Sequence, residues 1–138
     1  MHSFPVRVYY EDTDLAGIVY YANYLKFIER GRSEWLREVG VDQRVLKQQG
    51  LVFAVRRVEA DYLSPARFDD QLVVESSLHA QTPARIVIDQ RVLREGAALF
   101  VARVTVVCLG EGGRPLRIPA DVAARLQSAA FCAQLTQN

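Results

Sequence analysis

The sequence has little cysteine and histidine and no long apolar run. Its two cysteines, Cys108 and Cys132, form no CxxC pair and have no histidine nearby, which excludes a zinc site built on them. The longest stretch without a charged residue, residues 126–138, is interrupted by several polar side chains. Because a membrane-spanning helix needs roughly 20 consecutive apolar residues, the sequence predicts no membrane span.

A strong excess of charge is also missing. There are 17 Lys and Arg against 16 Asp and Glu, which gives a formal charge of +1. Nucleic-acid binding depends mainly on neutralising phosphates, so nucleic acid is excluded as the main partner. Half of the residues are apolar and 24% are charged, a balance typical of a folded globular protein. The N-terminus lacks the apolar run of a signal peptide, and we therefore expect a cytoplasmic protein.

The pattern of apolar residues predicts one domain over residues 1–138, since no repeat or linker divides it. A spacing of three or four predicts a long helix over residues 24–39, a short one over 41–49 and a C-terminal one from Pro119. Alternation predicts strands over residues 5–11, 52–62, 72–80, 85–95 and 98–108. In the second of these strands, the alternation places five residues on one face: Val52, Ala54, Val58, Ala60 and Tyr62.

This order of elements predicts an α+β fold. Four consecutive strands with short connections require an antiparallel sheet, and the long amphipathic helix must cover its apolar face. The alternating strand–helix order of a nucleotide-binding sheet is excluded. Gly31 lies on the buried stripe of the long helix, where it weakens helix propensity, so we expect a close approach of another backbone segment there.

The segment between the first strand and the long helix is the candidate for chemistry. It places Asp12 and Asp14 at a strand end and then Gly17 in a turn, followed by aromatic residues that lead into the helix. The N-terminus of a helix offers free N–H groups that suit a developing oxyanion. A carboxylate held nearby can act as a nucleophile or general base in acyl transfer. Alternatively, both aspartates only supply turn or capping hydrogen bonds.

These residues begin a series of motifs that match one protein family. The segments DLAGIVY (14–20) and NY (23–24) resemble the signature of hotdog-fold acyl-CoA thioesterases of the YbgC and 4-hydroxybenzoyl-CoA thioesterase type. The match continues through FIER (27–30), FAVRR (53–57) and DYLSPARFDD (61–70), and it is nearer to the YbgC branch. The resemblance covers about residues 5–116.

The resemblance implies a hotdog fold, in which a curved antiparallel five-stranded sheet wraps around one long central helix. It also implies homodimers formed by edge-to-edge extension of the sheet, which assemble into homotetramers. In such a fold, Gly31 is a close-packing site.

For the site, the resemblance implies that Asp14 is the catalytic carboxylate, which attacks the thioester carbonyl or activates water. The carbonyl oxygen is polarised by a backbone N–H at the start of the central helix, which corresponds to Tyr21. Gly17 permits the turn that joins the two. Many YbgC-like sequences carry a histidine where this chain has Tyr21, so the contribution of this side chain stays open.

The implied substrate is an acyl-CoA, and coenzyme A enters as part of it, so no cofactor or metal is expected. Arginine suits bidentate contacts with phosphate, and we select Arg56 and Arg85 as candidates. Tyr20 and Tyr24 are candidates for contact with the acyl group, although their spacing is also that of core residues.

Three other functions are suggested by parts of the sequence. The pattern of Asp12 and Asp14 is a D-x-D that suits Mg²⁺, but the sequence lacks a phosphate-binding loop. A hotdog dehydratase relies on a histidine beside an acid, whereas His2 and His79 lie away from the acidic turn. The main alternative is a non-catalytic adaptor that binds an acyl-CoA or an acyl carrier protein, and the need for Asp14 separates it from a hydrolase.

Overall fold

The computed structural model describes residues 1–136 and contains one antiparallel sheet. The strands lie in the order β1 (His2–Arg7), β3 (Gln71–Thr82), β4 (Arg85–Arg94), β5 (Ala97–Leu109) and β2 (Val52–Tyr62). A sixth strand, β6 (Pro115–Leu116), pairs with β5. The helices are α1 (Asn23–Glu38), α2 (Gln43–Gln48) and α3 (Ala120–Thr136), and short 3₁₀ turns cover Tyr10–Asp12 and Glu111–Gly113.

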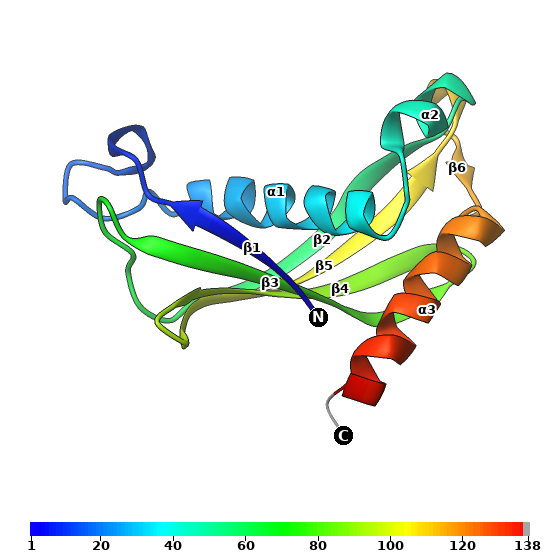
Figure 1. The fold of residues 1–138 in the computed structure, drawn as a ribbon. Coiled ribbons are helices and arrows are strands. Elements are labelled where there is room, and N and C mark those ends of the chain that lie inside the picture. Colours follow the sequence, from blue (N-terminus) through cyan, green and yellow to red (C-terminus); the bar gives the residue numbers. More distant parts are fainter. Residues whose placement is uncertain (137–138) are drawn as a thin grey trace.

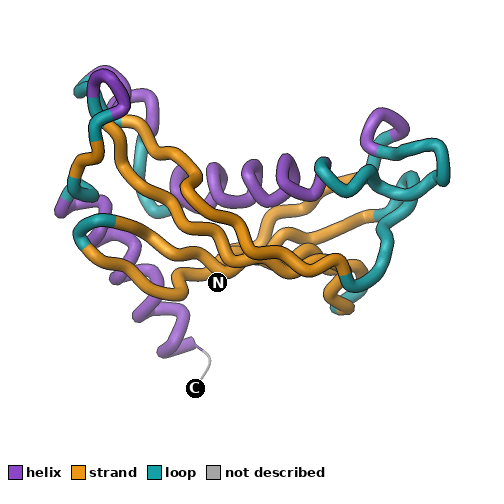
Figure 2. The backbone as a smooth tube through the Cα atoms, turned by 180° about the vertical axis from the view of Figure 1, so that it is seen from behind, coloured by secondary structure: helices purple, strands orange, loops and turns teal. Residues whose placement is uncertain are grey.

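The sheet is curved, and α1 lies along its concave face (Figures 1 and 2). The buried stripe of α1 packs on inward-facing residues of the central strands, and it consists of Tyr24, Phe27, Ile28, Gly31, Trp35 and Leu36. This arrangement confirms the prediction of an α+β hotdog fold with a sheet around one long helix. The sheet has six strands where five were predicted, because a two-residue strand is too short to produce a visible alternation.

Gly31 lies where α1 passes closest to β3. A Cβ atom at this position would be 2.5 Å from Val74 Cγ1 and 3.1 Å from Val74 Cβ. Gly31 is thus a close-packing site, as expected, but the neighbour is a buried valine side chain and not another backbone segment. The missing side chain lets the helix lie directly on the sheet.

A buried polar cluster also joins α1 to the sheet. Gln90 of β4 is 1% exposed, and its Nε2 donates to the Ile28 carbonyl and to Ser76 Oγ, each at 2.8 Å. Its Oε1 accepts a hydrogen bond from Arg32 at 2.9 Å. Because buried polar groups are costly unless paired, this cluster favours one position of α1 on the sheet.

β2 forms one edge of the sheet, and the prediction that its even-numbered apolar residues share a face is wrong. A bulge between Val55 and Arg57 shifts the register of β2 against β5. Val58 therefore lies on the face that α1 covers, whereas Val52 lies on the opposite face. None of the 11 residues of β2 is buried, since the strand pairs only with β5 within the part of the chain that the structure describes.

The first strand lies nearer to the N-terminus than the predicted range of 5–11. It pairs with β3 from His2 to Arg7, and the chain then turns because Asp12 Oδ2 accepts a hydrogen bond from the Tyr9 N–H at 2.8 Å. α3 packs beside the part of β3 that β1 leaves unpaired, and its C-terminal end lies on the far side of the sheet from α1 (Figure 1). No helix within residues 1–136 has the length and apolar character needed to cross a membrane.

Candidate active site

The predicted acidic segment lies between the end of β1 and the start of α1, at the end of the sheet shown on the left of Figure 1. The carbonyl oxygen of Asp12 accepts hydrogen bonds from the Tyr20 N–H and from Asn23 Nδ2, each at 2.9 Å. Together with the hydrogen bond that the Tyr9 N–H donates to the Asp12 carboxylate, these contacts account for Asp12 as a structural residue. They fix the acidic segment against the start of α1.

Asp14 begins a tight turn. Its N–H donates to the Ile18 carbonyl at 2.9 Å, its carbonyl accepts from the Gly17 N–H at 3.0 Å, and its Oδ1 accepts from the Ala16 N–H at 2.9 Å. Gly17 has a φ of +80°, a conformation that glycine adopts without strain. The side chain of Asp14 is exposed, and its Oδ2 has no hydrogen-bond partner within residues 1–136. The turn thus presents a carboxylate to solvent in a fixed position.

The start of α1 offers free backbone donors. Ala22 is the N-cap residue, and its side chain cannot accept a hydrogen bond from the first turn. Among the described residues, the N–H groups of Tyr21 and Ala22 have no acceptor. Unpaired N–H groups at this end of a helix carry partial positive charge, so they can stabilise negative charge on an oxygen atom.

The predicted tyrosines divide into an exposed pair and a buried residue. Tyr20 and Tyr21 are exposed, and their ring centroids lie 4.9 Å apart. Interaction with the Tyr21 side chain raises the pKa of Tyr20, and the negative charge of Asp14 adds a smaller effect in the same direction. Tyr24 is only 3% exposed and stacks on Phe100, with centroids 5.0 Å apart. Its ring therefore lies in the core, unlike the rings of the exposed pair.

The loop over residues 63–70 supports this end of the molecule. Ala66 is completely buried; its N–H donates to the Tyr24 hydroxyl at 3.0 Å, and its carbonyl accepts from the Val19 N–H at 2.8 Å. Asp70 Oδ2 accepts from Arg94 at 2.7 Å and from the Arg67 N–H at 2.8 Å. Desolvation opposes ionisation, but these donors outweigh it, so the pKa of Asp70 lies below its usual value.

The two candidate arginines lie toward the other end of the sheet. Arg56 occupies the bulge of β2, and Arg85 is the first residue of β4, beside the end of β5. Both side chains are exposed, and neither has a hydrogen-bond or ion-pair partner within the described part of the chain. Within one protomer, the structure therefore does not bring them to the turn that carries Asp14.

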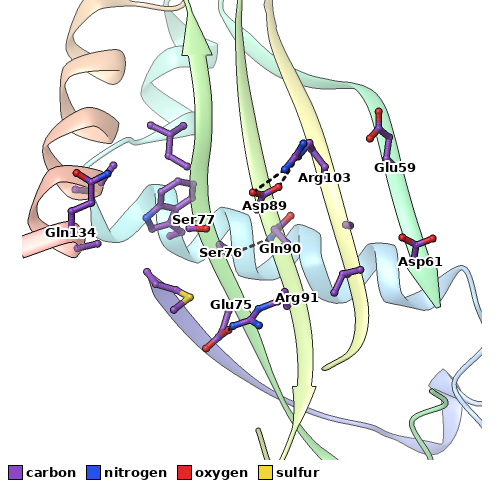
Figure 3. Close-up of a pocket in the computed structure, with 18 residues that line it drawn as sticks. Glu59, Asp61, Glu75, Ser76, Ser77, Asp89, Gln90, Arg91, Arg103 and Gln134 are labelled. Atoms are coloured by element: carbon purple, nitrogen blue, oxygen red, sulfur yellow. Dashed lines mark hydrogen bonds and ion pairs between the residues drawn. The ribbon is translucent and has the colours of Figure 1, made fainter. Parts of the chain in front are cut away.

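A separate hollow of about 650 Å³ lies at the middle of the sheet, partly on its outer face and partly against α3 (Figure 3). Its charged side chains are largely paired with one another: Glu75 with Arg91, and Asp89 with Arg103 at 2.8 Å. None of the predicted site residues lines it. Across residues 1–136, no three His, Cys, Asp or Glu side chains gather as potential metal ligands.

Two polar contacts at the site were not anticipated from the sequence. Asn23 links the helix start to the acidic segment through the Asp12 carbonyl, and the Tyr62 hydroxyl donates to the Tyr21 carbonyl at 2.9 Å. Both residues lie within the motifs that resemble the thioesterase family. Their place in these motifs was the only sequence feature that could have pointed to a role at the site. Their hydrogen-bond acceptors are backbone carbonyl oxygens, which residue types alone do not identify.

Comparison with known proteins identifies the family. Residues 8–126 match the family model of the thioesterase-like superfamily. The chain is 44% identical over 124 residues to the acyl-CoA thioesterase YbgC of Haemophilus influenzae, which covers 88% of this chain and 91% of that protein. It is 38% identical over 125 residues to the acyl-CoA thioester hydrolase YbgC of Escherichia coli O6:H1, covering 89% of this chain and 93% of the relative.

Solved structures agree with this assignment. A probable thioesterase from Bartonella henselae is 38% identical, has a TM-score of 0.82, and covers 86% of this chain and 98% of its own. A thioesterase from Thermus thermophilus, solved in complex with coenzyme A and Zn, is 25% identical with a TM-score of 0.82 and covers 94% of each chain. The chain therefore belongs to the YbgC family of hotdog-fold thioesterases, within the thioesterase-like superfamily.

Proposed function

We propose that this protein hydrolyses acyl-CoA thioesters to a free acid and coenzyme A, with Asp14 as the catalytic carboxylate. The observation that carries the proposal is the turn that holds the exposed Asp14 carboxylate, tied through Asp12 to a helix start with free N–H groups. The substrate class is supported by the names of the YbgC relatives and by the coenzyme A in the Thermus thermophilus structure.

In the proposed reaction, the thioester carbonyl oxygen accepts a hydrogen bond from the Tyr21 N–H. The Asp14 carboxylate either removes a proton from the attacking water or attacks the carbonyl carbon itself. The carbon–sulfur bond then breaks, and coenzyme A leaves as a thiolate that takes up a proton. If Asp14 attacks directly, water hydrolyses the resulting anhydride in a second step. Gly17 allows the turn to present the carboxylate, and the exposed Tyr20 ring offers apolar area for an acyl group.

We also propose that two chains pair through β2 to form a homodimer, and that two dimers form the homotetramer. β2 is an unprotected edge strand with exposed apolar residues, including Val55, Val58 and Tyr62. Such edges favour pairing with another strand. Antiparallel pairing would bring the arginine-bearing end of one sheet, with Arg85, toward the Asp14 end of the other. This supports a role of Arg56 and Arg85 in holding coenzyme A phosphates across the dimer.

The test is thiol release from short-chain, long-chain and benzoyl-CoA thioesters by the unmodified protein and by Asp14→Asn. We expect turnover on at least one thioester and a decrease of about a hundredfold or more in the folded variant. Glu11→Gln is the matched control, since Glu11 is an exposed acid of the same segment with no hydrogen-bond or ion-pair partner in residues 1–136.

The outcomes separate the hydrolase from the adaptor that binds acyl-CoA or an acyl carrier protein. Equal turnover by the unmodified protein and Asp14→Asn would refute the assignment of the carboxylate. If the unmodified protein releases no thiol from any coenzyme A ester but binds one of them, the hydrolase proposal fails and the adaptor is favoured. Release only from an acyl carrier protein thioester would change the substrate and retain the reaction.

A further inference from the structure

Tyr62, the last residue of β2, has a hydroxyl group whose position is closely defined. This hydroxyl donates a hydrogen bond of 2.9 Å to the carbonyl oxygen of Tyr21, just before α1. Its ring packs edge-on against Tyr24 and Phe100, with centroid distances of 5.6 Å and 5.0 Å. Both neighbours are buried, so they hold the ring in place although Tyr62 itself is 49% exposed.

This hydrogen bond also fixes the direction of the next backbone N–H. The Tyr21 carbonyl and the Ala22 N–H belong to the same planar trans peptide group, in which they point in opposite directions. Holding the carbonyl toward Tyr62 therefore directs the Ala22 N–H away from β2. That N–H has no acceptor within the described residues. A donor on the carbonyl also polarises the amide, which makes its N–H a stronger donor.

We propose that Tyr62 is a positioning residue that orients and polarises the Ala22 N–H as a second hydrogen-bond donor to the substrate carbonyl oxygen, beside the Tyr21 N–H. The inference rests on the proposed thioester hydrolysis. Tyr62 does not contact the substrate and acts through the Tyr21–Ala22 peptide group. Since the carbonyl oxygen gains negative charge only as the reaction proceeds, Tyr62 affects kcat more than KM.

The Tyr62 hydroxyl keeps its proton, and so stays a hydrogen-bond donor, at neutral pH. Partial burial, followed by the nearby Tyr21 and Tyr24, raises the pKa of Tyr62 above its ordinary value of 10.0. Tyr62 is therefore protonated throughout the neutral pH range. Loss of its hydroxyl should lower the rate evenly across this range and leave the shape of the pH profile unchanged.

Tyr62→Phe tests the inference, because it keeps the ring and removes the hydroxyl. We expect kcat to decrease about three- to tenfold with a KM changed by less than about twofold, as for loss of one hydrogen bond felt in the transition state. In a ¹⁵N-labelled protein, the Ala22 amide resonance should move, because its peptide group loses a partner. Ser33→Ala is the matched control, since it removes a hydroxyl hydrogen bond on the same helix, to Glu29 at 3.1 Å.

A second variant, Tyr62→Leu, separates the hydroxyl from the ring. Similar kcat values for the Phe and Leu variants would support the hydroxyl, provided both keep a cooperative thermal transition. If Tyr62→Phe matches the unmodified protein in kcat and in the Ala22 resonance, or if only Tyr62→Leu is slow, the inference is overturned and Tyr62 is a packing residue. No turnover by the unmodified protein would instead overturn the proposed function, so the two failures are distinguishable.

Discussion

Substitution of Gly31 by alanine tests how closely α1 lies on the sheet. The new Cβ would be 2.5 Å from Val74 Cγ1, at least about 1 Å inside the normal carbon–carbon contact of about 3.5–4.0 Å. Val74 is completely buried in β3, where it is paired with β1 on one side and β4 on the other. Its side chain cannot move aside without disturbing the core, so α1 has to shift.

The expected magnitude comes from two opposing effects. Alanine is favoured over glycine in a helix by about 1 kcal/mol. Overpacking a buried site typically costs about 1–3 kcal/mol, and an overlap this large is at the upper end. We therefore expect Gly31→Ala to lower the free energy of unfolding by about 2 kcal/mol. The same substitution on an exposed helical surface would raise it.

A double-mutant cycle measures the overlap directly, by urea unfolding of the unmodified protein, Gly31→Ala, Val74→Ala and the double variant. Val74→Ala removes the methyl group that the new Cβ meets and leaves a small void. Because each substitution relieves the defect of the other, the double variant should be more stable than additivity predicts by about 1 kcal/mol or more. Additive effects, or a stabilised Gly31→Ala, would refute the close approach.

Two further predictions concern carboxylates near the site. Asp14→Asn should abolish turnover but change the free energy of unfolding by less than about 1 kcal/mol, as measured by denaturant titration. Stability is kept because the amide oxygen of asparagine can still accept the hydrogen bond from the Ala16 N–H. For Asp70, the lowered pKa means that its contribution to stability is present above the unfolded value near 3.8 and is lost as pH falls through the lower folded value. Asp70→Asn should therefore destabilise the protein by about 2 kcal/mol at pH 7 in thermal scans, and by progressively less as the pH is lowered below 3.8. A loss that does not change with pH would contradict this.

The fold was predictable from the sequence where burial follows a regular period. α1 was placed to within a residue or so at each end, because its apolar stripe and Gly40 mark it independently of the rest of the chain. β2 was placed with the correct bounds, but its faces were not, because one extra residue at a bulge reverses the alternation. β6 escaped detection because a strand of two residues has no period.

The candidate site was less accessible to sequence reasoning, for a different physical reason. The acidic turn was recognised from residue types, since Asp14 and Gly17 have marked preferences for such positions. The contacts that hold it in place run from side chains to backbone oxygens, as from Asn23 to Asp12 and from Tyr62 to Tyr21. A sequence states which groups can donate a hydrogen bond, but only the folded chain determines which carbonyl lies opposite them.

The position of Tyr62 links the proposed chemistry to the proposed dimer. The residue that holds the Tyr21 carbonyl ends the edge strand β2, and the second copy would pair with this same strand. Pairing would restrict the motion of β2, and with it the direction of the Ala22 N–H.

Dissociation should therefore lower kcat before the fold is lost, although each protomer retains Asp14. We expect specific activity to fall on dilution together with the dimer fraction measured by light scattering. Val58→Lys puts a charge on the exposed edge, so both the activity and the dimer fraction should fall at a higher protein concentration in this variant. Full specific activity in a sample that scatters as a monomer would refute this link.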